Sequence, residues 1–106
     1  MDDVANDPTG TWGEQVRGRP WLSFDAQRCT GSDGCNSMAG PWRVTGDGTV
    51  DIGPVMMTRM YCEGVDTWLS GMASVRVAGD DLIVFDADGE RIGALPRAAS
   101  GPPQRA

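Results

Sequence analysis

The chain has 106 residues, enough for one domain of ordinary size but too few for two. Its 15 glycines and 7 prolines indicate many turns and argue against an all-helical bundle. The formal net charge of −6 opposes binding to nucleic acid or to anionic membranes. Every basic residue is arginine and histidine is absent, which removes the commonest general base, the usual zinc ligand and the lysine nucleophile. We therefore expect neither an enzyme nor a cofactor.

Both ends of the chain are poor in apolar residues and rich in charged, proline or small ones. Such segments bury too little surface to offset their ordering entropy, so we expect disordered tails over residues 1–9 and 97–106 and one domain over residues 10–96. The first residues are acidic and lack a signal-peptide pattern, and no apolar run is long enough to insert in a membrane. We expect a cytoplasmic protein, or a secreted or lipid-anchored one if a leader has been removed.

Between the tails, short segments of alternating apolar and polar residues are separated by closely spaced turn residues, a pattern typical of antiparallel β structure. The Asp47-Gly48 pair favours a tight hairpin turn, because such turns need positive φ angles. We expect about eight short strands, which in chain order cover residues 11–14, 21–24, 28–31, 41–45, 49–52, 75–78, 82–85 and 91–95.

One segment departs from this pattern. Apolar residues between 65 and 73 recur at the spacing of one helical face, which predicts a helix of two to three turns near residues 65–74 packed on the sheet. Gly71 lowers its intrinsic stability by about 1 kcal/mol relative to alanine, so the helix should depend on tertiary contacts.

Polar clusters that could carry chemistry have simpler interpretations. The acidic residues at 86–90 do not match a calcium loop, because Arg91 stands where that loop needs glycine, and they fit a hairpin turn. The three cysteines lack the paired spacing of a zinc site, and no histidine could activate a thiol nucleophile. They permit one disulfide with one thiol left over. A hydrolase would have to rely on carboxylates such as Asp33, Asp51 or Glu63.

Large apolar side chains offer a second set of candidates. For each of the four tryptophans we favour core packing over contact with a ligand. The methionines at 56, 57 and 60 lie in a stretch that fits neither strand nor helix, and we expect them to fill irregular space beneath a connection rather than form a binding surface. The tryptophans are Trp12, Trp21, Trp42 and Trp68.

With these residues in view, the sequence resembles the META domain family, typified by the heat-shock protein HslJ. The resemblance begins at Gly10-Thr11-Trp12, continues through residues 19–24 and is most specific in the block 31–42, which contains Gly34-Cys35-Asn36. A second signature, Thr58-Arg59-Met60-Tyr61-Cys62, follows at the expected distance. Two signatures in the right order make a chance match improbable.

The resemblance implies a mainly β fold, a small antiparallel β-barrel or half-open barrel of lipocalin-like outline with one α-helix packed across it. It implies no enzymatic activity and no cofactor. The expected function is a stress- or envelope-related interaction module that binds an unknown protein or peptide as a monomer. The alternative is a small carrier that holds an apolar ligand in the barrel mouth. A barrel this small should be filled by its own side chains, so we expect no enclosed pocket of a few hundred Å³.

The resemblance also assigns roles to particular residues. Because each signature contains a cysteine, it implies that Cys35 and Cys62 are neighbours beneath the helix that can form a disulfide, and that Cys29 is free. Arg59 is either a buried partner of a carboxylate or carbonyl, which we favour, or an exposed anchor for an acidic ligand. A candidate interaction surface lies around Trp21 and Arg59. The signature residues, expected to be mainly structural, are Gly34, Cys35, Asn36, Gly40, Thr58, Arg59, Met60 and Cys62.

Overall fold

A computed structural model describes residues 7–98 and contains nine strands. They are β1 (Gly10–Gly13), β2 (Trp21–Phe24), β3 (Arg28–Ser32), β4 (Ser37–Val44), β5 (Val50–Ile52), β6 (Met56–Met57), β7 (Ser74–Ala78), β8 (Asp81–Phe85) and β9 (Arg91–Pro96). Eight of them follow the antiparallel order β1-β2-β3-β4-β5-β7-β8-β9, and β6 pairs with β4 outside this path. The mainly β, antiparallel architecture expected from the sequence is confirmed, and β6 is an additional strand.

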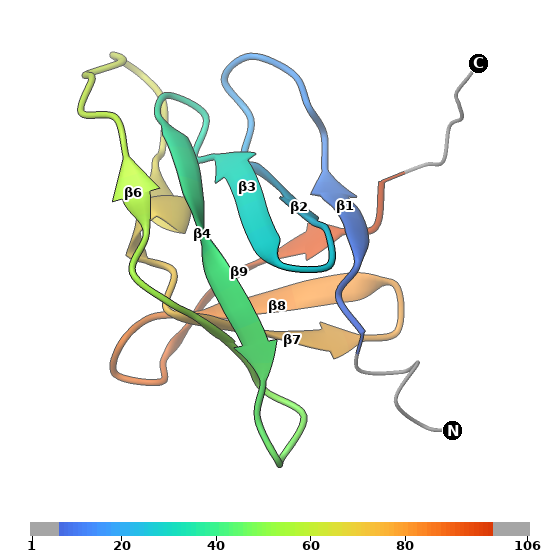
Figure 1. Cartoon of the computed structure of the whole chain (residues 1–106). Helices are drawn as coiled ribbons and strands as arrows, with labels where there is room; N and C mark the ends of the chain where they lie inside the picture. The colour runs from blue at the N-terminus through green and yellow to red at the C-terminus, as the bar shows by residue number, and fades with distance from the viewer. Residues whose placement is uncertain (1–6, 99–106) are drawn as a thin grey trace.

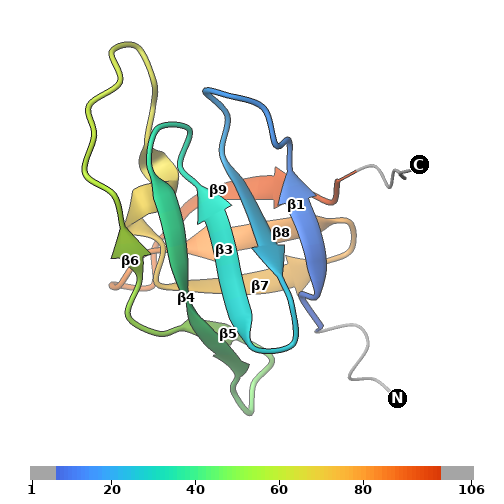
Figure 2. The ribbon, with the colours of Figure 1, turned by 45° about the horizontal axis from the view of Figure 1, so that its top comes forward.

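The sheet curls into a nearly closed barrel. Strand β4 is long enough to pair with β3 and β6 along one part and with β5 along another. Strand β5 pairs in turn with β7 and so joins the β1–β4 layer to the β7–β9 layer. In Figure 1 the β7–β9 strands run crosswise behind β1–β4, and Figure 2 shows the same two layers with the top turned forward. An antiparallel bridge between Trp12 and Arg97 links β1 to the end of β9 and nearly closes the barrel.

Alternating side chains fill the space between the layers. On β2, Leu22 and Phe24 are buried, and on β8 Leu82 and Val84 are buried, as the two-residue period of a strand requires. The buried apolar core comprises Trp12, Leu22, Phe24, Cys29, Met38, Val50, Leu69, Met72, Val75, Leu82, Val84 and Leu95.

Trp12 ties both ends of the described chain to the core. Its side chain is fully buried, and its indole Nε1–H donates a hydrogen bond to the carbonyl of Pro8 (2.8 Å). The Arg97 guanidinium lies over the indole ring, 4.1 Å from the ring centroid, a cation–π geometry. Most of the expected tails, residues 1–6 and 99–106, lies outside the described residues.

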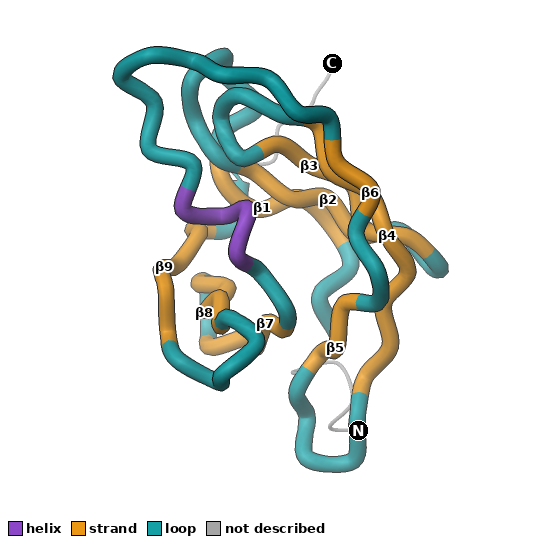
Figure 3. The backbone as a smooth tube through the Cα atoms, turned by 90° about the vertical axis from the view of Figure 1, so that its left-hand side faces the viewer, coloured by secondary structure: helices purple, strands orange, loops and turns teal. Residues whose placement is uncertain are grey.

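The predicted α-helix near residues 65–74 is wrong. The segment contains only a 3₁₀ turn, η2 (Trp68–Gly71), which Figure 3 shows in purple beside β9. Met72 is already extended, and Ala73 accepts a hydrogen bond from the Ile52 N–H and donates one to the Phe85 carbonyl. These sheet contacts outweigh a helical propensity already weakened by Gly71. The apolar spacing nevertheless serves the core, because Leu69 and Met72 are buried.

The expected hairpin turn at Asp47-Gly48 is present between β4 and β5, with Gly48 at φ 87°. The Asp47 carboxylate accepts hydrogen bonds from the Thr45 hydroxyl (2.6 Å) and from the Thr49 N–H (3.0 Å). Because these bonds favour the ionised form, with the Thr45 hydroxyl as the largest cause, the pKa of Asp47 falls to about 2.

The lowered pKa of Asp47 in the folded state predicts how the stability of the fold depends on pH. Asp47 stabilises the fold above its unfolded pKa of about 3.9, and this contribution is lost as pH falls through the folded value. We expect an NMR titration to place the Asp47 carboxyl midpoint near 2, and Asp47→Asn to reduce the loss of stability between about pH 4 and pH 2. Thr45→Val, which removes the hydroxyl donor, should raise the midpoint. A midpoint near 3.9 in the wild type would contradict this assignment.

Candidate functional site

The first signature forms the turn between β3 and β4. Asp33 is 1% exposed, and its Oδ1 accepts the backbone N–H groups of Cys35 (2.9 Å) and Asn36 (2.6 Å). Gly34 has φ 100°, and a Cβ there would lie 3.0 Å from a Val65 methyl and 3.1 Å from a backbone carbonyl oxygen. The turn therefore needs an acceptor at 33 and glycine at 34.

Asn36 joins this turn to the second signature. Its side-chain Oδ1 accepts the Met60 N–H (2.6 Å), and its Nδ2 donates to the Met60 carbonyl (3.3 Å). The amide side chain thus pairs with both backbone groups of one residue, as a neighbouring strand would. The same Oδ1 also accepts a hydrogen bond from the Thr58 hydroxyl (3.0 Å). We call residues 58–62, held in this way, the clamped loop.

A disulfide fixes the end of the clamped loop. Cys35 and Cys62 are bonded, with their Cα atoms 5.8 Å apart, so the structure contains the pair that the family resemblance implied. The bond lies at the tip of the β3–β4 turn and not beneath a helix, since the expected helix is absent. Cys29 is a free, buried thiol on β3.

The clamped loop presents large side chains to solvent. Met60 is 60% exposed and Tyr61 is 87% exposed, while Met56 on the adjoining β6 is 73% exposed. Arg59, which lies between Met56 and Met60 in the sequence, is also exposed. The favoured interpretation of Arg59 as a buried partner is therefore wrong. The expectation that these methionines fill internal space is also wrong for Met56 and Met60. Met56, Arg59, Met60 and Tyr61 are called the exposed patch below.

The contacts of the clamped loop explain which of its side chains are exposed. Thr58 and Cys62 turn toward the β3–β4 turn to make their bonds, and Asn36 holds the Met60 backbone in register with them. Within the described residues, the side chains of Arg59 and Tyr61 make no such bond, and both are exposed.

The other candidates from the sequence occupy different places. Trp12 is in the core as expected, and Trp42 and Trp68 are partly buried against it. Trp42 packs edge-on against Phe24, with ring centroids 5.7 Å apart. Trp21 is half-buried on β2, and strands β3 and β4 separate it from β6 in the sheet order. The structure therefore does not bring Trp21 and Arg59 into one cluster.

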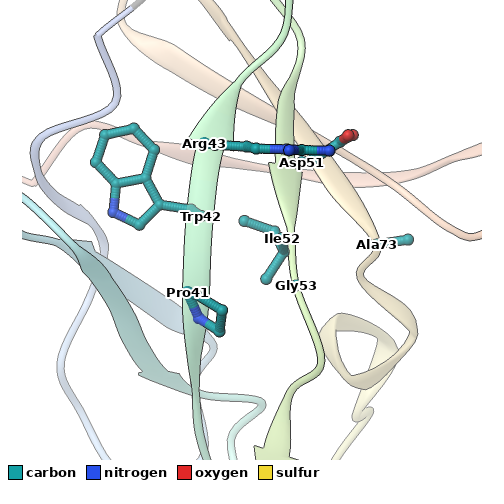
Figure 4. A pocket seen from close by; sticks show the side chains of 7 residues that line it. All are labelled: Pro41, Trp42, Arg43, Asp51, Ile52, Gly53 and Ala73. Atoms are coloured by element: carbon teal, nitrogen blue, oxygen red, sulfur yellow. The ribbon is translucent and has the colours of Figure 1, made fainter.

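Hollows open to solvent lie on the surface of the described part of the chain, and three of them are relevant to binding. One of about 460 Å³, shown in Figure 4, follows β4 and β5, with Ala73 on its far side. A second of about 440 Å³ lies beside Trp68 at the β1–β9 seam. A third of about 480 Å³ adjoins the exposed patch and is lined by Ser37, Met38, Ala39, Met56, Met57 and Thr58.

Reactive groups are few among residues 7–98. Burial is the main cause that raises the pKa of the Cys29 thiol to about 12, which keeps it protonated at neutral pH. Within this range no three histidine, cysteine or acidic side chains gather closely enough to hold a metal ion. No helix in the same range is long and apolar enough to cross a membrane.

Comparison with known proteins agrees with the two signatures. No curated protein and no solved structure matches the chain. The family model described as META domain matches residues 7–99, which include both signatures and all the strands. The chain therefore belongs to the META domain family.

Proposed function

We propose that this META domain is a non-enzymatic module that binds a protein or peptide through the exposed patch. The observation that carries the proposal is that the side chains of the patch are exposed although the loop that bears most of them is held in place. Met60 and Tyr61 lie in water on a loop held by a disulfide and by the Asn36 amide, and Met56 is exposed on the adjoining strand β6. Grouped exposure of large apolar side chains marks interaction sites more often than scattered exposure does.

The chemistry of the patch suits recognition of a protein surface. Tyrosine and arginine are enriched among the residues that contribute most to protein interfaces. Methionine is flexible and polarisable, so Met56 and Met60 can adapt to the shape of a partner. Because the loop is already braced, less conformational entropy is lost on binding than for a free loop.

A non-enzymatic role is supported by the surroundings of Cys29 and Asp33, two of the groups that catalysis could use. The Cys29 thiol is buried and protonated, and the chain has no histidine to activate it. Asp33, one of the carboxylates a hydrolase would need, is buried and accepts two backbone N–H groups within its turn. The Oδ1 atom of Asp33 therefore has a structural role in the turn, while its Oδ2 atom is buried without a hydrogen-bond partner among the described residues.

The cellular part of the proposal rests on the family alone. We infer a stress- or envelope-related role from the resemblance to heat-shock members of the family. The net charge of −6 supports a protein or peptide partner over a nucleic acid.

The carrier alternative has less support. Trp12, Phe24 and the other core side chains fill the space between the two layers. The described hollows are open to solvent, whereas carrier sites enclose most of the ligand surface. Quenching of tryptophan fluorescence by micromolar oleate, with saturation at one molecule per chain, would favour the carrier instead.

The proposal predicts that capture of partners depends on the patch. A photo-cross-linker is placed at residue 63. We expect the Met60→Ser/Tyr61→Ser variant to form specific cross-links in host lysate at least about tenfold less than the wild type does. Val16→Ser and Val44→Ser are matched controls, because these valines are 57% and 46% exposed at other sites. All these variants should stay within about 0.5 kcal/mol of wild-type stability. An unchanged cross-linking pattern in the patch variant would refute this binding site.

A further inference from the structure

Strand β6 has one partner within the described sheet. Its two residues pair with β4, and it stands off the path that closes the barrel. Figures 1 and 2 both show β6 at the outer flank of the β1–β4 layer, directly before the clamped loop. A strand in this position has a second edge whose backbone groups are not used by the sheet.

The register shows which backbone groups these are. The Thr58 N–H donates to the Ser37 carbonyl (3.1 Å), and the Ser37 N–H donates to the Thr58 hydroxyl (3.0 Å), so Thr58 faces β4. Met57, opposite Met38, is then in the alternate pair, whose N–H and C=O groups point away from each other. The N–H and C=O of Met57 therefore point away from β4.

Arg59 continues the same alternation. The Met60 N–H and C=O both face the Asn36 amide, on the side toward the β3–β4 turn. The backbone groups of Arg59 then face the opposite side, as those of Met57 do. No hydrogen bond within the described range engages the Arg59 backbone. Two donors and two acceptors are thus presented along one edge.

We propose that the partner adds to β6 as an extended strand that pairs with the backbone of Met57 and Arg59. This inference rests on the proposed function, since it specifies how the same patch binds its partner. The occupant is an extended segment of another protein in which apolar residues flank an acidic one. Main-chain pairing supplies affinity in this mode, and side-chain contacts supply specificity.

Two observations define the chemistry of that segment. The Arg59 side chain is exposed and makes no ion pair with a carboxylate in the described part of the chain, so an acidic side chain can pair with it. The hollow of about 480 Å³ beside Met56 and Met57 offers room for an apolar side chain of the partner. A single acidic residue suits the site, because further negative charge would be repelled by the chain's net charge of −6.

A proline at position 57 tests the pairing directly. It removes the outward N–H but no hydrogen bond to β4, and proline is tolerated where an edge strand faces solvent. Met57→Ala is the matched control, because it removes the same side chain and keeps the N–H. The probe is a fluorescein-labelled, acetylated peptide, Val-Thr-Val-Glu-Val-Thr-Val. A second copy of the probe carries N-methyl groups on alternate backbone nitrogens.

We expect Met57→Ala to bind the probe and Met57→Pro to bind it at least about tenfold more weakly. The N-methylated probe should be weakened by a similar factor, which keeps the test valid if Met57→Pro does not fold. Arg59→Gln should weaken binding of the glutamate probe but not of its glutamine counterpart.

Strand addition is wrong if wild-type protein does not bind the probe below about 1 mM, or if N-methylation has no effect. If the Met60→Ser/Tyr61→Ser variant still loses its cross-links in that case, the interaction site stands and only the pairing mode fails. A wild-type dimer in solution that Met57→Pro converts to a monomer would show that a second copy occupies the edge, and would overturn the choice of partner.

Discussion

Loss of the Cys35–Cys62 disulfide is expected to lower the free energy of unfolding by about 3 to 4 kcal/mol. The bond joins residues separated by 27 positions, and without it the unfolded chain regains the conformations that the closed loop excludes. The loss is measured by denaturant unfolding of the oxidised wild type against the Cys35→Ala/Cys62→Ala variant. It is comparable with a large part of the whole stability of a small domain.

Reduction provides the matched control for this prediction. A dithiol reductant should destabilise the wild type and leave the Cys35→Ala/Cys62→Ala variant unchanged. Cys29→Ala should keep its sensitivity to reductant, because Cys29 is not part of the bond. The Cys29 thiol, whose pKa is raised to about 12, remains protonated and is a poor nucleophile for exchange with the disulfide. Equal unfolding midpoints for oxidised and reduced wild type would contradict the prediction.

The strands could be predicted because their pattern is local. Leu22 and Phe24, and likewise Leu82 and Val84, alternate with less buried neighbours. A period of two appears in the sequence wherever one face of a strand meets the core. The turn at Asp47-Gly48 could be predicted for a similar reason, since its glycine supplies a positive φ angle.

The segment around residue 70 shows the limit of such patterns. Its apolar spacing correctly indicates that Leu69 and Met72 are buried, but not the backbone conformation that buries them. Ala73 accepts a hydrogen bond from the Ile52 N–H and donates one to the Phe85 carbonyl, and these partners, distant in sequence, decide that conformation. Strand β6 was not predicted because two residues are too few to show a period.

The candidate site, too, could be predicted from the sequence only in part. The family resemblance identified Cys35, Asn36 and Cys62, since they belong to recognisable signatures. It did not reveal that Arg59 is exposed, because exposure depends on how residues 58–62 pack against the β3–β4 turn, a contact between segments distant in sequence. The exposure of Tyr61 has the same origin, and no local pattern in the sequence contains it.

Asn36→Ala is expected to destabilise the protein by about 2 to 4 kcal/mol. The substitution removes the hydrogen bonds to both Met60 backbone groups and to the Thr58 hydroxyl. Each such bond contributes about 0.5 to 1.5 kcal/mol, and groups left without a partner add to the cost. The disulfide still ties the far end of the clamped loop, so the chain should fold and the effect can be measured by denaturant unfolding.

The local signature of this loss is hydrogen exchange at Met60. Its N–H donates to Asn36 in the wild type, so Asn36→Ala should speed its exchange by at least about tenfold. Thr58→Val is the matched control, because it removes a hydroxyl of the same cluster and leaves the Asn36–Met60 bonds intact. Slow exchange at Met60 in Asn36→Ala would mean that the disulfide alone orders the loop. Fast exchange only in Asn36→Ala would show that one amide side chain holds the backbone from which Arg59 and Tyr61 project.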